Sequence, residues 1–174
     1  MMQDFLRALL DSNVYTALLV AGLKDLHMEL LHLKSLGKLR VYGLRTIRQE
    51  LKEAPKKLPY YDGNYVIDLL RLYDGLVGKS YEEDERMDKL AKAYFIAYRG
   101  CGGGIGGDKF ANDLLIVACA SLKQVDVVVS EDKSSLLNSY ARKAYDVVNG
   151  AAGLATPRLI SLKEFIGEVG RLVR

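Results

Sequence analysis

The chain has 174 residues and a net charge of +3, which results from 25 Lys and Arg against 22 Asp and Glu. One domain over residues 1–174 is expected for this length, and 49% hydrophobic residues are enough to build a sizeable core. The charge is too small to argue for nucleic-acid binding by itself. No apolar run is long enough to span a membrane, and the two cysteines lack metal-site spacing, so we expect a reduced, cytoplasmic protein with no membrane contact.

The chain begins with a predicted strand followed by two helices. The apolar run over residues 5–10 is typical of a buried strand, and Asp11 stands at its carboxyl end. Helical spacing of apolar residues then predicts helices over 14–21 and about 24–36, each closed by a glycine.

A second strand and helix follow. Residues 39–42 are expected to form the strand. Thr46 and Gln49 have the spacing of a capping box, which predicts a helix that begins at Thr46 and ends before Pro55. Glu50 then lies in the first part of this helix, close to the carboxyl end of the preceding strand.

The segment over residues 55–107 is expected to contain only helices and loops. Apolar periodicity predicts one helix over about 66–77 and another that ends near residue 98. Ser80 and Glu83 have the spacing of a second capping box, and we expect them to open the latter helix.

The most apolar stretch comes next and is the centre of the predicted core. It begins with Asn112 and Asp113 and runs almost without a polar residue from 114 to 122, so we expect a helix buried on every side. The β-branched run 127–129 predicts a strand covered on both faces, as in parallel sheets. Asp132 follows just beyond this strand.

The remaining residues predict a helix over about 137–148 and a short strand at 158–160. Ser161 and Glu164 form a third capping-box pair, which opens a last helix. Strands that alternate with helices predict an α/β domain with a mostly parallel sheet.

Four acidic residues are expected to meet at one edge of that sheet. Asp11 and Asp132 follow strands, while Glu50 and Asp113 lie near helix starts. In parallel α/β sheets these positions share the carboxyl edge, where ligands collect. Any one of these acids could be an ordinary cap or a solvated residue. Four carboxylates together would repel one another without a cation, which favours a site for Mg²⁺ or Mn²⁺.

In these segments the chain resembles the PIN-domain family of metal-dependent nucleases. The matching stretches, in chain order, are LLDSNV, IRQELK, NDLLIVACA, VVVSED and TPRLISLKEFI. The resemblance implies a three-layer α/β/α domain with a central, mostly parallel sheet of four or five strands, here with extra helices between residues 55 and 107.

The resemblance also implies an activity and a set of partners. The expected activity is Mg²⁺- or Mn²⁺-dependent hydrolysis of phosphodiester bonds in single-stranded RNA, as in the VapC-type toxins of toxin–antitoxin pairs. The expected partners are therefore single-stranded RNA, a small antitoxin protein and a second copy of the chain in a homodimer.

The expected roles divide the polar residues into three groups. The metal-binding and catalytic residues are Asp11, Glu50, Asp113 and Asp132. Asn13 and Ser130 are expected to orient those ligands. The basic residues that flank the acidic positions in the sequence could hold substrate phosphates, and they are Arg99, Lys109 and Lys133.

Two other functions remain open at this point. A phosphohydrolase of small molecules would use a similar site, but such enzymes usually carry a second Asp two residues after the first, where this chain has Asn13. A catalytically weak module for RNA binding or dimerisation is the other alternative. Retention of all four acids argues against it without excluding it.

Overall fold

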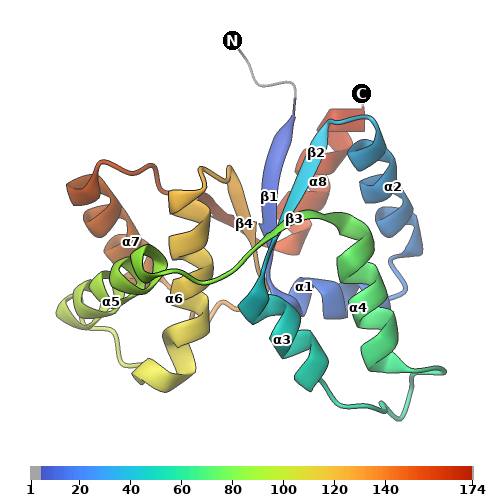
Figure 1. Cartoon of the computed structure of the whole chain (residues 1–174), viewed down its shortest axis with the longest axis horizontal. Coiled ribbons are helices and arrows are strands. Elements are labelled where there is room, and N and C mark those ends of the chain that lie inside the picture. The colour runs from blue at the N-terminus through green and yellow to red at the C-terminus, as the bar shows by residue number, and fades with distance from the viewer. Residues whose placement is uncertain (1–4, 174) are drawn as a thin grey trace.

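A computed structural model describes residues 5–173, which contain a five-stranded sheet at the centre of three layers (Figure 1). All neighbouring strands are parallel, in the order β3-β2-β1-β4-β5. The strands are β1 (Leu6–Leu10), β2 (Leu39–Leu44), β3 (Val77–Tyr81), β4 (Val127–Val129) and β5 (Arg158–Ile160).

Helices cover both faces of this sheet, as Figure 1 shows. One layer contains α1 (Ser12–Val20), α2 (Lys24–Ser35), α3 (Arg45–Glu53), α4 (Tyr65–Leu76) and α8 (Leu162–Val173). The other contains α5 (Glu85–Gly100), α6 (Gly107–Leu122) and α7 (Ser139–Ala152), which pack on one another. The predicted three-layer α/β/α class is therefore confirmed. Within residues 5–173, no helix is long and apolar enough to cross a membrane.

The central apolar stretch is buried as predicted except at Leu115 and Leu122, which are partly exposed. Every residue from 116 to 121 of α6 is buried, and the three residues of β4 are fully inaccessible. The helix begins earlier than the sequence indicated, at Gly107 rather than near Asn112. Its extra turns are held by Phe110, which is fully buried against Tyr98 with 4.7 Å between ring centroids. Tertiary packing thus extends a helix whose glycine-rich start has no side-chain cap.

The prediction for residues 55–107 was wrong in one respect, because β3 lies within that segment. The strand follows α4 directly and pairs only with β2, so it forms one edge of the sheet. Its middle three residues, Gly78, Lys79 and Ser80, are exposed. An exposed edge strand needs no apolar run, which is why the pattern of hydrophobic residues did not indicate it.

Two of the predicted capping boxes are also corrected. Helix α3 begins at Arg45, and its Thr46 backbone N–H donates to Glu83 across 2.7 Å instead of pairing with Gln49. Helix α5 is capped by Asp84, whose Oδ1 accepts a hydrogen bond from the backbone N–H of Met87 at 2.9 Å. Glu83, which follows β3, therefore caps α3, the helix that follows the neighbouring strand β2. Local sequence spacing does not reveal this long-range contact.

The third capping box forms as predicted. The backbone N–H of Ser161 donates to Glu164 Oε2 at 2.7 Å, and the backbone N–H of Glu164 is 3.3 Å from Ser161 Oγ. Glu131, which follows β4, adds a bond of 2.6 Å from the backbone N–H of Leu162. The start of α8 is thus tied to the carboxyl end of β4.

The strand register brings the ends of the central strands together. Leu10 at the end of β1 is level with Val129 of β4, and Val129 is level with Ile160 of β5. Asp11 and Ser130, the next residues along β1 and β4, therefore leave the sheet side by side.

Candidate active site

Asp11 is the most deeply buried of the four acids, with only 4% of its surface exposed. It caps α1, and its Oδ1 accepts a hydrogen bond from the backbone N–H of Ser12 at 2.7 Å. Its Oδ2 accepts from Ser130 Oγ at 2.7 Å and from Asn13 Nδ2 at 3.0 Å. Burial raises the pKa of Asp11, although the bonds from Ser130 and Ser12 oppose that rise.

Ser130 links this carboxylate to the loop that carries Asp132. Its hydroxyl donates to Asp11 and accepts a bond from the backbone N–H of Asp132 at 3.0 Å. Asn13 spans the same gap, because its Oδ1 accepts from the Glu131 backbone N–H at 3.1 Å. Asn13 and Ser130 thus each contact both Asp11 and the backbone of the loop that carries Asp132.

Asp132 is held by the loop immediately after it. Its Oδ1 accepts from the backbone N–H and hydroxyl of Ser134, at 2.9 and 2.7 Å, and from the backbone N–H of Ser135 at 3.0 Å. Burial acts to raise the pKa of Asp132, but the bonds from Ser134 and Ser135 outweigh it and leave that pKa lowered. Asp132 therefore remains an anion with a fixed orientation.

Asp113 lies in the second turn of α6, not before the helix as predicted. Its Oδ2 accepts a short hydrogen bond from Ser135 Oγ. Burial is the main cause that raises the pKa of Asp113 to about 7; the bond from Ser135 opposes this rise, and the charges of Asp11, Asp132 and Glu50 contribute to it. The charged form of this carboxyl is therefore disfavoured when no cation lies near it.

Glu50 completes the acidic group from α3. Its Oε1 accepts from Asn112 Nδ2 at 2.6 Å, so the helices that carry Glu50 and Asp113 touch at this point. Its charge acts on both Asp11 and Asp113. The structure thus brings all four predicted acids to the carboxyl edge of the sheet. In the described part of the chain, no salt bridge reaches any of them.

The three predicted substrate-binding cations do not contact the acids through their side chains in the described residues. Arg99 donates through Nη1 to the Gly103 carbonyl at 3.0 Å, so it braces the glycine loop before α6. Lys109 and Lys133 are exposed, and the charge of Lys133 acts on Glu164 of α8. Across residues 5–173, no ion pair or hydrogen bond joins any of the three to the acids.

Ser135 and Asn112 belong to the site, although the sequence analysis did not identify them. Ser135 contacts both Asp132 and Asp113, and Asn112 contacts Glu50. A signal for Ser135 was present, since serines two and three residues after an aspartate favour a turn closed by the aspartate side chain. No local pattern connects Asn112 with Glu50, which is 62 residues away.

The donor set suits a hard divalent cation. Among residues 5–173, no three His, Cys, Asp or Glu side chains already stand close enough to surround an ion. Mg²⁺ commonly uses only one or two carboxylates and keeps several waters, so it needs no closed protein cage. The pKa of Asp113 is raised mainly by burial and in part by the charges of Asp11, Asp132 and Glu50, and a bound cation would oppose both effects. On these grounds the residues fit Mg²⁺ or Mn²⁺.

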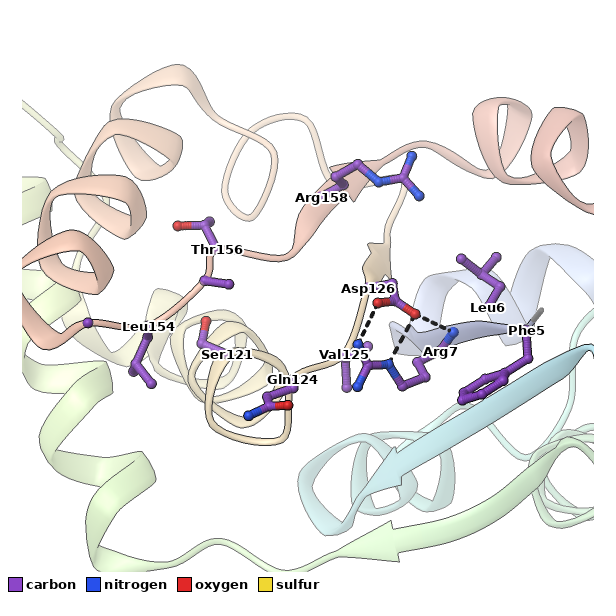
Figure 2. A pocket seen from close by; sticks show the side chains of 12 residues that line it. Phe5, Leu6, Arg7, Ser121, Gln124, Val125, Asp126, Leu154, Thr156 and Arg158 are labelled. Atoms are coloured by element: carbon purple, nitrogen blue, oxygen red, sulfur yellow. Dashed lines mark hydrogen bonds and ion pairs between the residues drawn. The ribbon is translucent and has the colours of Figure 1, made fainter. Parts of the chain in front are cut away.

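A large cavity of about 660 Å³ lies at the opposite, amino edge of the sheet (Figure 2). There the Arg7 guanidinium donates two hydrogen bonds to the Asp126 carboxylate, from Nη2 to Oδ1 at 2.7 Å and from Nε to Oδ2 at 3.1 Å. This ion pair is satisfied and far from the acids along the strands. A smaller groove of about 240 Å³, lined by Glu50, Asn112 and Arg45 among others, does border the acidic edge.

Comparison with known proteins supports the fold. No family model matches the sequence, and no curated protein matches it either. A chain in the crystal structure of VapBC2 from Rickettsia felis, bound to a DNA fragment from their promoter, is similar with a TM-score of 0.55. The match covers 88% of this chain and 97% of that chain at 11% identity. At that identity the likeness shows a shared fold, consistent with the predicted PIN-like domain.

Proposed function

We propose that the protein is a metal-dependent endoribonuclease that hydrolyses phosphodiester bonds of single-stranded RNA. The observation that carries the proposal is the continuous chain of contacts from Asp11 through Ser130, Asp132 and Ser135 to Asp113. These groups come from three separate elements, and nothing in the core requires such a concentration of acids. The sequence resemblance to PIN-domain nucleases and the shared fold of the VapBC2 chain agree with it.

Asp11, Glu50, Asp113 and Asp132 would hold Mg²⁺ or Mn²⁺ in this proposal. When bound, such an ion would lower the pKa of a water and neutralise charge on the scissile phosphate. Ser130 and Asn13 keep Asp11 oriented, and Ser135 does the same for Asp113. Burial of Asp11 limits competing water around its carboxylate.

The test is cleavage of a labelled single-stranded RNA with Mg²⁺ and then with a chelator. Because partners that merely orient a metal ligand already contribute 10–100-fold, Asp11→Asn should lower the rate by about 100-fold or more. Its circular dichroism spectrum should remain that of the parent. Asp25→Asn, an exposed position on α2, is the control and should cut normally.

Two results would contradict the proposal. If Asp11→Asn cleaved RNA at the parental rate, the proposed active site would be wrong. If the chelator left RNA cleavage unchanged, the proposed metal dependence would be wrong. If the parent hydrolysed only small phosphate esters, the phosphohydrolase alternative would replace the ribonuclease.

We further propose that the protein acts as the toxin of a toxin–antitoxin pair, with a small antitoxin as partner and a homodimer as its own assembly. Support comes from the VapC-type sequence resemblance and from the fold shared with a VapBC2 chain. Expression in a bacterial host should arrest growth, whereas expression of Asp11→Asn should not. Equal growth of both cultures would contradict the toxin role.

A further inference from the structure

A groove of about 320 Å³ lies between α3 and the end of β3. Three of its lining residues are cations, Arg45, Arg48 and Lys52, and one is an anion, Glu82. The cations recur every three or four residues of α3, so they lie along one face of the helix over about 10 Å of its length. This basic groove concentrates positive charge in a chain whose net charge is only +3.

Two of the three cations are available to a ligand. Arg45 and Lys52 are exposed, and within residues 5–173 neither takes part in an ion pair. Arg48 differs, because its Nε and Nη2 donate to the two carboxylate oxygens of Asp74, at 3.0 and 2.9 Å. Arg45 and Lys52 are therefore the side chains of the basic groove that can bind an anion without first breaking a salt bridge.

The basic groove is continuous with the groove of about 240 Å³ that borders the acidic edge, because both are lined by Arg45 and Gln49. Three glutamates line the second groove, and Glu50 is one of them. Helix α3 thus presents cations on one face and Glu50 on the next. A polyanion with one charge at a metal ion held by the acids would place its following charges beside Arg45 and Lys52.

We propose that the basic groove along α3 holds the backbone phosphates of an RNA strand on one side of the bond to be cut. The proposal rests on the proposed ribonuclease function, and it assigns the phosphate contacts to Arg45 and Lys52, which the sequence analysis did not identify. Phosphate contacts fix the position of the strand and do not select its bases. A protein segment rich in Asp and Glu would also match the cations, but the three glutamates of the adjoining groove would repel it.

The test measures binding of a fluorescent single-stranded RNA to the full chain with a chelator present, so that metal-dependent cleavage does not interfere. Arg45→Gln combined with Lys52→Gln should raise the dissociation constant about tenfold at about 0.1 M salt. The plot of log affinity against log salt should become shallower by about 1.4, since each phosphate contact to a single strand contributes about 0.7. Lys92→Gln is the control. It removes an exposed cation of α5, in the other helical layer, and should bind like the parent.

A conservative variant separates charge from structure. Arg45→Lys keeps the positive charge and should retain most of the affinity that Arg45→Gln loses. A parent that binds RNA through this groove but does not cut it would contradict the ribonuclease function and support the groove. Three results would overturn the proposal: a parent that does not bind RNA, a double variant with the parental affinity and salt dependence, or an oligoglutamate peptide that binds the parent more tightly than RNA does. The last result would assign the groove to an acidic protein segment.

Discussion

At the scale of single residues, the buried carboxylate of Asp11 is the feature that most needs an explanation. An unpaired buried anion is costly unless hydrogen bonds replace its hydration. Asp11 obtains three, from Ser12, Asn13 and Ser130, and it also lies at the amino end of α1, where the helix dipole favours negative charge. Asp11 is thereby kept in place before any ligand arrives.

The raised pKa of Asp113 should make the free energy of unfolding depend on pH. That pKa is about 7 in the folded chain against 3.8 for an ordinary aspartate, so between these values the folded chain holds a proton that the unfolded chain releases. The free energy of unfolding should therefore fall as pH rises from about 4 to 7, by at most roughly 4 kcal/mol from this group. Urea unfolding at pH 5 and pH 8 without divalent cations measures the fall.

Asp113→Asn tests the assignment, since an amide does not titrate. This variant should show a smaller fall in stability between the two pH values than the parent does. Mg²⁺ at pH 8 should stabilise the parent more than it stabilises the variant, because the proposed ion binds the ionised carboxylate. An identical pH dependence in both proteins would show that another group is responsible.

At the scale of elements, Gly43 allows the packing between β2 and α4. A Cβ at this position would lie 2.0 Å from the hydroxyl oxygen of Tyr73. That hydroxyl donates to the Leu44 carbonyl at 3.3 Å and lies 3.2 Å from Ser80 Oγ, so it ties α4 to both β2 and β3. The absence of a side chain at Gly43 is what permits this three-way contact.

Gly43→Ala should therefore destabilise the protein by overpacking. The added methyl group must displace a buried ring, which typically costs about 1–3 kcal/mol. Gly75→Ala in α4 is the control, because a Cβ there meets nothing within 4 Å and alanine favours the helix. Urea denaturation of both variants measures the difference. Equal stabilities of Gly43→Ala and the parent would contradict the close contact.

At the scale of the whole molecule, a buried polar network holds the layer formed by α5, α6 and α7. The Tyr94 hydroxyl of α5 donates to Asn149 Oδ1 of α7 at 2.6 Å and lies 3.1 Å from Ser121 Oγ of α6. Asn149 Nδ2 also donates to Ser121 Oγ at 3.0 Å. One group of hydrogen bonds thus joins the three helices, including the one that carries Asp113.

Tyr94→Phe should weaken this layer. It leaves a buried amide oxygen without its donor, at a cost of roughly 1–3 kcal/mol in the free energy of unfolding. Tyr145→Phe is a close control. The ring centroids of Tyr94 and Tyr145 are 5.0 Å apart, and the buried Tyr145 hydroxyl has no hydrogen-bond partner within residues 5–173. Thermal unfolding should rank Tyr94→Phe clearly below Tyr145→Phe, and the reverse order would contradict the role of the network.

Much of the architecture could be predicted because it depends on local patterns. The helix α6 and the strand β4 can be recognised from their runs of apolar residues, and the cap formed by Ser161 and Glu164 lies within four residues. The edge strand β3 could not be recognised in this way, because its middle residues face solvent. The cap on α3 was also missed, since its acceptor Glu83 is 37 residues from Thr46.

Local patterns were enough to predict that the chain alternates buried strands with helices, and that Asp11, Glu50, Asp113 and Asp132 lie near the carboxyl edge of a parallel sheet. Both follow from periodicity and chain direction, which are properties of neighbouring residues. The groups that connect those acids could be identified only from the three-dimensional fold. The bridges through Ser130, Ser135 and Asn112, and the raised pKa of Asp113, depend on distances between segments far apart in the chain.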